Sequence, residues 1–509
     1  MTDSPREDDR LRTLRWGVYT LLIAAALGQA MGKIAAVNSV DLQRLEKHRV
    51  DQAVQREREK LAASGLSGNE LRQLLDEYRE KATEKLRLQR PFLSANDRSR
   101  WLTVRALAEN GTFEIDPLLE EPTWDTIDMV QHPNREGEPR QYSSKPPLLM
   151  VLLAGPYWAI TQISGATLGD SPYVIGRGLL MIVNGGALVT LLLCVALLVE
   201  RFGVGEFDRL FAMAAAAFGT QLSAFAPVLN NHLIAAAATG VACVAWSELM
   251  TAEKPRAGLS FLAGLTAAFA TACELPALSL LVFFGASLLW KRAGETLRCF
   301  TPAALLVAVA FFATNYWAHN SLKPPYAHRN TADTSENWYD YEYTVRGKTR
   351  DSYWRNPAGI DRGEGSKSTY ALHVLVGHHG VFSLTPVWLL SFCGMARLLA
   401  SKDYVARQLA LITLAITGAC LVFYIGMRPQ ADRNYGGMTS GFRWLFWVAP
   451  LWLAMTPAGV RCCGARPLGR AFAATLLAFS AFSASYPTWN PWSQPWIYRL
   501  LEYLGFTVL

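Results

Sequence analysis

The sequence carries little charge for its length. Of its 509 residues, 18% are Asp, Glu, Lys or Arg and 51% are hydrophobic, whereas a soluble chain usually has about 25% charged residues. The charged residues gather in the ranges 1–16, 38–145 and 319–373, and much of the remainder is nearly free of Lys and Glu. This distribution excludes an ordinary soluble domain and indicates a membrane protein with several spans of about 20 apolar residues.

Other features are missing as well. The eight cysteines show neither a disulfide framework nor the spacing of a zinc site, and none falls in the two long polar loops. The net charge of +7 has no basic patch with interleaved aromatic residues beside it, so nothing indicates a nucleic-acid partner. No small-residue cleavage site clearly follows the first apolar stretch, 16–36, so we expect an uncleaved membrane helix there rather than a signal peptide.

Eleven stretches are apolar and long enough to be membrane helices. They are 16–36, 174–199, 207–228, 233–250, 257–273, 276–290, 299–318, 381–399, 405–427, 443–460 and 469–485. Four of the five short loops on one side carry an excess of Lys and Arg, so the positive-inside rule places the N-terminus in the cytoplasm. Residues 38–145 and 319–380 then lie on the outer face. The apolar segment 145–160 is short, and we expect an interfacial or re-entrant helix there.

The expected fold is an all-α, polytopic membrane bundle of about eleven transmembrane helices with a large first outer loop. Two highly charged helices, broken at GLSG (65–68), are interpreted as an α-hairpin on a solvated surface, with a partner-binding coiled coil as the alternative. The expected parts are the cytoplasmic tail and first transmembrane helix (1–37), the first outer loop (38–145) with the charged hairpin (41–90) and an acid-bearing helix (96–110), the interfacial helix and transmembrane bundle (145–318), the second outer loop (319–380), and the C-terminal transmembrane helices with an outer tail (381–509).

Three cations stand at the outer ends of apolar segments. Lys145 begins the interfacial helix, Arg177 begins a span, and Arg443 precedes a span whose N-terminal helix dipole points outward and favours an anion. Charge at the membrane surface is costly unless it is paired or used. Snorkelling alone would explain Lys145, but together the three predict a site for a lipid-linked phosphate or diphosphate.

Two polar segments accompany these cations. In SAND (94–97), Asp97 lies at an expected helix start, where an acid is often only an N-terminal cap. The short outer turn LNNHL (229–233) carries Asn231 and His232, and a capped turn is the simpler interpretation of it. The adjacent histidines in VGHHG have no third ligand with clear spacing, so no metal site is expected.

Several segments, taken in order, resemble a known family. NDRSRWLTVRALAENGTF (96–113), SKPPLLMVLLAGPYW (144–158), the arginine in YVIGRGLL, the turn LNNHL and GFRWLFWVAP (441–450) resemble motifs of the GT-C superfamily, membrane glycosyltransferases that use polyprenyl-phosphate sugars. The branch of protein O-mannosyltransferases and aminoarabinose transferases is the most similar. The likeness is strongest over 92–250 and near 434–460. Two departures are that Arg98 replaces the second carboxylate of the family's acid pair, and that the LNNHL turn lacks the acid of several relatives.

The resemblance implies transfer of a sugar from a polyprenyl-phosphate donor to a hydroxyl of a lipid, glycan or protein acceptor, with inversion, on the outer face of a multi-pass membrane protein in a bacterial inner or plasma membrane. It implies that Asp97 is the general base and that His232 supports the base or contacts the acceptor. No cofactor or metal is expected. The implied substrate contacts are Lys145, Arg177, Asn231 and Arg443.

The alternative function is a transporter or flippase for a lipid-linked sugar. Such a protein would also need polar outer turns and a cationic site for lipid phosphate. It would more often show internal repeats and helices interrupted at the membrane midplane. Since no clear internal repeat is visible in the sequence, we favour the glycosyltransferase.

Overall fold

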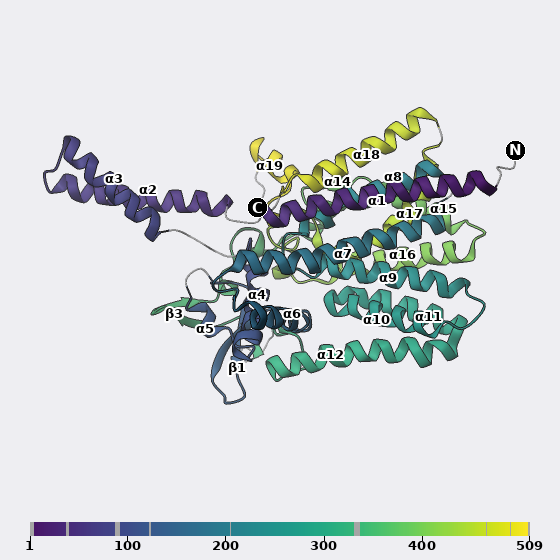
Figure 1. The fold of residues 1–509 in the computed structure, drawn as a ribbon, viewed down its shortest axis with the longest axis horizontal. Coiled ribbons are helices and arrows are strands. Elements are labelled where there is room, and N and C mark those ends of the chain that lie inside the picture. Colours follow the sequence, from purple (N-terminus) through teal and green to yellow (C-terminus); the bar gives the residue numbers. More distant parts are fainter. Residues whose placement is uncertain are drawn as a thin grey trace.

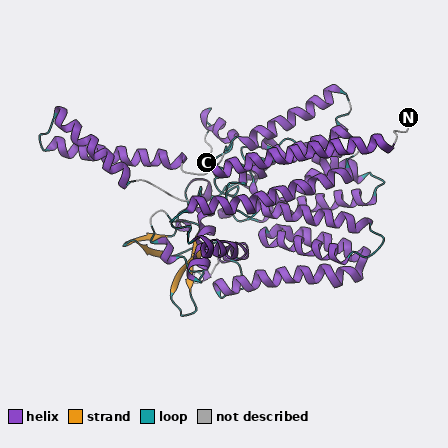
Figure 2. Cartoon of the chain, in the orientation of Figure 1, coloured by secondary structure: helices purple, strands orange, loops and turns teal. Residues whose placement is uncertain are grey.

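The computed structural model describes residues 5–36, 40–86, 92–121, 124–203, 205–329, 336–464, 466–488 and 490–506. These residues are largely helical, with two short β-hairpins at one end (Figure 2). The bundle helices are α1 (Pro5–Ala36), α7 (Pro172–Phe202), α8 (Glu206–Phe218), α9 (His232–Thr251), α10 (Ala257–Cys273), α11 (Leu278–Glu295), α12 (Thr301–His319), α15 (Trp388–Leu399), α16 (Tyr404–Leu421), α17 (Ala449–Cys462) and α18 (Pro467–Ser485). Each of the eleven predicted stretches overlaps one of them.

Seven segments among the described residues are long and apolar enough to cross a membrane. They are Asp9–Ala36, Pro172–Phe202, His232–Thr251, Leu275–His319, Tyr404–Met427, Arg443–Cys462 and Pro467–Ser485. The segment Leu275–His319 holds two helices, α11 and α12, because the backbone leaves the helical conformation at Arg292. Shorter apolar helices, including α10 and α15, pack beside them. The prediction of an all-α, polytopic membrane bundle is confirmed.

Glycines let the bundle helices approach closely. A Cβ atom on Gly394 of α15 would lie 2.0 Å from the carbonyl oxygen of Met455 on α17, and one on Gly459 of α17 would lie 1.7 Å from that of Leu390. No larger side chain fits between these two backbones. Small residues serve the same purpose wherever membrane helices pack tightly, because lipid provides no hydrophobic drive for their association.

The two predicted outer loops lie at the end of the bundle opposite the start of α1 (Figure 1). Their elements are α2 (Val40–Ala63), α3 (Gly68–Lys85), α4 (Ala95–Asn110), α5 (Asp116–Leu119), α13 (Lys367–Leu375), and the strand pairs β1 (Met129–Pro133) with β2 (Pro139–Ser143) and β3 (Glu342–Val345) with β4 (Lys348–Asp351). Helix α6 (Leu148–Ser164) follows the first of these loops. The short α14 (Val381–Leu384) and α19 (Trp496–Tyr503) follow. The loops bond to each other, since Gln131 N–H donates to the Trp338 carbonyl at 3.0 Å.

The charged hairpin projects away from the bundle (Figure 1). Helices α2 and α3 run side by side, turning through Gly65 and Gly68, both at positive φ. An exposed ion pair joins them, with Arg79 Nη1 2.9 Å from Asp51 Oδ1. The predicted hairpin is therefore a separate arm, and its residues do not line the cavity described below.

A buried histidine joins the outer loops. The His132 ring on β1 stacks on that of Tyr142 on β2 with centroids 4.1 Å apart, and His132 Nε2 lies 3.0 Å from His319 Nδ1 at the end of α12. Burial lowers the pKa of His132 to about 4. The folded state therefore favours the neutral form of His132.

We expect the junction of the outer loops to weaken in acid. The unfolded chain binds a proton at His132 with a pKa near 6.5, whereas the folded one binds it only near 4, so stability falls as pH drops below about 6.5. The loss reaches about 2 kcal/mol at pH 5. Thermal unfolding of the purified protein between pH 7.5 and 5 measures it, and His132→Phe should flatten the dependence. An equally steep dependence in that variant would contradict the assignment to His132.

Candidate functional site

A cavity of about 770 Å³ lies where the two outer loops meet the ends of the bundle helices. Its volume is within the usual range for small-molecule sites, about 300–1,000 Å³. We call it the main cavity. Its charged lining residues are Arg100, Asp128, Lys145, Glu274, Arg329, Asp361, Arg428, Asp432 and Arg443, accompanied by Asn96, Asn231, His232 and Asn434.

Three cations form a cluster in this cavity, with Arg100 buried and Lys145 and Arg443 half-buried. Arg100 comes from α4, Lys145 stands three residues before α6, and Arg443 stands shortly before α17. Arg100 Nη2 donates to Asn231 Oδ1 at 2.7 Å, and Lys145 Nζ lies 3.1 Å from Asp128 Oδ1. Burial lowers the pKa of Arg100 to about 10 and that of Lys145 to about 8, and the neighbouring cations add to both effects.

Asp128 stays ionised among these cations. Burial acts to raise its pKa, but Lys145 and Arg100 hold that pKa below its usual value. Its own backbone is fixed, because Ser99 Oγ donates to the Asp128 carbonyl at 2.5 Å and Ser144 N–H donates to it at 3.2 Å. Asp128 thus sets the position of Lys145 in the cluster.

A chain of polar contacts orients Arg443. The guanidinium only donates, so the contact of 2.9 Å between Arg443 Nη1 and His232 Nε2 makes that ring nitrogen an acceptor. The proton of a neutral His232 is then on Nδ1, which contacts Glu274 Oε1. Glu274 also accepts from Asn231 Nδ2 at 3.0 Å. His232 is therefore occupied in holding Arg443 and is not a free base.

Asp97 lies behind the wall of the main cavity. It is fully buried, and its Oδ1 accepts from Leu229 N–H at 2.8 Å, which ties α4 to the turn that carries Asn231. The cap of α4 is Ser94, whose Oγ accepts from Asp97 N–H at 3.0 Å, so Asp97 is not needed as a cap. Its Oδ2 is buried without a hydrogen-bond partner among the described residues. Burial raises the pKa of Asp97 to about 7.

The structure brings together four of the six residues singled out in the sequence. Lys145, Asn231, His232 and Arg443 line the main cavity; Asp97 and Arg177 do not. Arg177 lies on α7, with its guanidinium 5.4 Å from the ring centroid of Tyr173. The third cation of the cluster is therefore Arg100 and not the predicted Arg177. Residues at one membrane depth can point in different directions around a bundle, and depth was all that the sequence indicated.

A tight turn joins the cation cluster to an acid. Asn434 Nδ2 donates to Asp361 Oδ1 at 3.1 Å, and two residues later the Gly436 carbonyl accepts from Arg443 Nε at 2.8 Å. Tyr353 OH donates to the other oxygen of Asp361 at 3.0 Å. Burial raises the pKa of Asp361, and the charge of Asp128 adds to the effect. Sequence reasoning missed Asp361, because no local pattern marks it.

Replacing Gly436 should weaken binding of a lipid phosphate at the cation cluster. Gly436 has a φ of +98°, and a Cβ there would lie 2.9 Å from Arg443 Nε. We expect Gly436→Ala to raise the Kd of polyprenyl phosphate at least tenfold, a cost of about 1.4 kcal/mol. The matched control is Gly165→Ala, which has the same kind of φ (+68°) but no atom within 4 Å of the new Cβ. Equal Kd values in the two variants would show that the turn does not position Arg443.

The main cavity also has an apolar side. Leu275 and Pro276, between α10 and α11, and Phe423 and Met427, at the end of α16, line it. Leu275 is 49% exposed and Met427 is 70% exposed, and both belong to segments that can cross a membrane. This side of the main cavity is therefore lined by exposed apolar side chains of segments long and apolar enough to cross a membrane.

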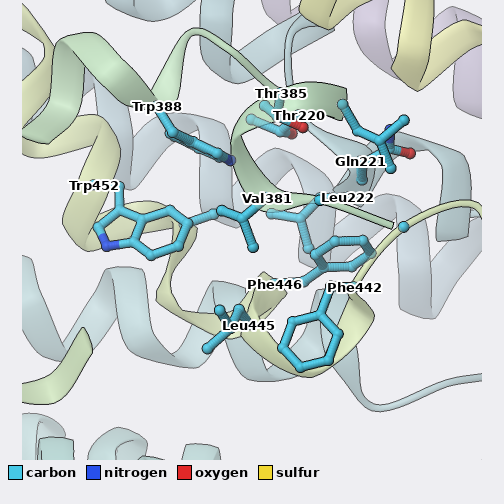
Figure 3. Close-up of a pocket in the computed structure, with 14 residues that line it drawn as sticks. Thr220, Gln221, Leu222, Val381, Thr385, Trp388, Phe442, Leu445, Phe446 and Trp452 are labelled. Carbon is cyan, nitrogen blue, oxygen red and sulfur yellow. The ribbon is translucent and has the colours of Figure 1, made fainter. Parts of the chain in front are cut away.

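A smaller pocket lies within the bundle. Figure 3 shows its lining, in which Trp388 and Trp452 face Phe442, Leu445 and Phe446. Its volume of about 30 Å³ has room for only one or two water molecules. It is too small for a substrate, and we regard it as a packing defect beside the segment that carries Arg443.

The described residues contain no group of three or more His, Cys, Asp or Glu side chains that could hold a metal ion. The adjacent histidines His378 and His379 contact each other through their Nδ1 atoms and pack around Tyr435. They do not line the main cavity. Their role in this structure is packing between the second outer loop and the Tyr435 turn.

Comparison with known proteins gives only distant likenesses, all among solved structures. No family model matches the chain, and no curated protein matches it. Among solved structures, the chain is similar to an archaeal oligosaccharyltransferase, AglB from Archaeoglobus fulgidus, in complex with an inhibitory peptide and a dolichol-phosphate. The identity is 14%, the match covers 82% of this chain and 55% of that one, and the TM-score is 0.36. The chain thus spans about half the length of that structure, and the likeness is too low to carry an argument.

Proposed function

We propose that this chain is a membrane glycosyltransferase of the GT-C type. It moves a sugar from a polyprenyl-phosphate donor to an acceptor hydroxyl on the outer face of the membrane. One observation carries the proposal: the buried Arg100 and the half-buried Lys145 and Arg443 line a single cavity that is apolar on one side and polar on the other. A lipid-linked phosphate needs both surroundings at once, because its chain stays in the bilayer while its headgroup is desolvated by protein.

The charges of the cluster suit a phosphodiester. Three cations face the carboxylates Asp128 and Glu274, with His232 neutral, which leaves one positive charge beside the single negative charge of a sugar phosphodiester. When the sugar leaves, the phosphate gains a second negative charge. Cations fixed in a desolvated site stabilise this developing charge more than the starting one, and that difference accelerates transfer.

The proposed reaction is a single displacement. The acceptor oxygen attacks the anomeric carbon, the bond from that carbon to the phosphate oxygen breaks, and its electron pair passes to the phosphate held by the cations. The acceptor proton goes to a carboxylate. We assign that role to Asp97, since its Oδ2 has no partner among the described residues and its pKa of about 7 suits a base at neutral pH. Asp97 is fully buried and does not line the main cavity, but its neighbour Asn96 does, so the acceptor must approach Asp97 past the first turn of α4.

The direct test is transfer itself. The purified chain, in lipid nanodiscs, is given a polyprenyl-phosphate sugar labelled in the sugar, together with cell-envelope material as acceptor. We expect label to enter the acceptor and free polyprenyl phosphate to appear in equal amount. Movement of intact labelled lipid across a vesicle membrane, with no release of polyprenyl phosphate, would instead show a flippase and overturn the proposal.

A further inference from the structure

A second cavity, of about 440 Å³, adjoins the main cavity, and we call it the outer cavity. Its lining residues are Arg329, Asn337, Tyr339, Asp340, Trp354 and Arg355. Arg329, Tyr339 and Trp354 line both cavities, so a ligand in one can extend into the other past these three side chains. All six residues belong to the second outer loop, away from the apolar side of the main cavity.

The aromatic rings of this passage are held in place. Trp354 Nε1 donates to the Ile127 carbonyl at 3.1 Å, which anchors the ring to the first outer loop. The Tyr339 ring meets it edge-on with centroids 6.2 Å apart, and the Arg329 guanidinium lies 4.3 Å from the Trp354 ring. Trp354 is only half-buried, so an apolar ring surface stands fixed within polar surroundings.

The charges of the outer cavity are balanced. Arg329 is 3.2 Å from Asp432, and Arg355 is 2.5 Å from Asp340 and 3.2 Å from Glu342. Both arginines are thus paired with carboxylates, whereas Arg100 and Arg443 in the main cavity contact the neutral side chains Asn231 and His232. The main cavity therefore suits an anion, and the outer cavity suits a neutral, polar ligand.

We propose that the outer cavity binds the acceptor and that this acceptor is a carbohydrate, an inference that rests on the proposed function. A sugar ring packs its apolar C–H face on an aromatic ring, here Trp354, while its hydroxyls bond to amide, carboxylate and guanidinium groups at the rim. The outer cavity supplies these groups as Asn337, Asp340 and Arg355. Asp361 in the main cavity accepts a hydrogen bond from Tyr353, the residue before Trp354 in the chain. Its carboxylate can accept a further hydrogen bond from a sugar hydroxyl.

Peptide and lipid acceptors fit the outer cavity less well than a carbohydrate does. An extended peptide gains most of its affinity by adding a strand to a sheet edge, but none of the six lining residues lies on β3 or β4. A lipid acceptor needs an apolar wall, and the outer cavity has no aliphatic lining residue among the residues the structure describes. The apolar wall lies at Leu275 and Met427, where the donor's chain is expected.

The test is binding of short saccharides to the full chain in detergent, measured by saturation-transfer NMR. The probes are maltotriose, mannotriose and N,N′,N″-triacetylchitotriose, beside a peptide rich in Ser and Thr. We expect at least one trisaccharide to bind, with a Kd raised about tenfold or more by Trp354→Ala, through loss of ring stacking and burial. Trp354→Phe keeps the stacking ring and should keep most of the affinity. Trp290→Ala, at a tryptophan 89% exposed on α11, is the matched control.

A second measurement separates this inference from the proposed function. Binding of polyprenyl phosphate to the wild type and to Trp290→Ala is measured separately and should be equal, because Trp290 lines neither cavity. If the wild type fails to bind polyprenyl phosphate, the proposed function fails. If polyprenyl phosphate binds but no trisaccharide does, if the peptide binds instead in a Trp354-dependent way, or if Trp354→Ala leaves trisaccharide affinity unchanged, the carbohydrate acceptor is overturned.

Discussion

Asp97→Asn is expected to lower sugar transfer by roughly 10²–10⁴-fold, the usual effect of losing a general base. The variant should fold, because the asparagine oxygen still accepts the Leu229 N–H and Ser94 still caps α4. Since Asp97 must be ionised to take a proton and its pKa is about 7, wild-type kcat/KM should fall as pH drops below that value. Initial rates of transfer between pH 5 and 9, corrected for the amount of folded protein, measure both effects.

Asp116→Asn is the matched control for this variant. Asp116 is also an acid of the first outer loop whose carboxylate accepts one backbone N–H, that of Gln141 at 2.9 Å, but no residue of its helix α5 lines the main cavity, whereas Asn96, next to Asp97 on α4, does. We expect this control to keep near-normal transfer. If Asp97→Asn also keeps it, Asp97 only ties α4 to the Leu229 turn, and Asp361, a carboxylate that lines the cavity, becomes the base to test.

Lys145→Met is expected to lower transfer by about 10²–10³-fold, the loss seen when one donor to a developing anion is removed from a desolvated site. The cost is large because Asp128 then remains buried beside the phosphate without its partner. The readout is kcat/KM for the polyprenyl-phosphate donor. Lys323→Met is the matched control, since Lys323 lies in the second outer loop with a side chain that is 65% exposed.

Deprotonation of Lys145 should also lower kcat/KM at alkaline pH. Its pKa is lowered to about 8, so the free protein loses this positive charge above that pH, and kcat/KM should fall there. Lys145→Arg keeps the charge to far higher pH and should remove the alkaline fall, even if its geometry lowers the rate. An unchanged alkaline limb in Lys145→Arg would assign that limb to another group.

The sequence by itself determined the class of fold. Each apolar stretch must satisfy its backbone hydrogen bonds within a helix once it is in lipid, so hydropathy and loop charge were enough to find all eleven bundle helices. Some residues that the sequence singled out by a local pattern also line the main cavity. Lys145 before two prolines, the Asn231–His232 turn and Arg443 at a span end all line one cavity.

Only the tertiary structure decided which charges meet. Arg177, predicted at the same depth as Lys145 and Arg443, does not line the cavity, whereas Arg100, Asp128 and Asp361 line it from three separate segments. The sequence gives the depth of a residue through hydropathy, but its direction around the bundle depends on how helices and loops pack. The pairing of residues far apart in the chain, such as Asp97 with Leu229 or Arg329 with Asp432, is fixed by that packing, because no local pattern encodes a contact between distant segments.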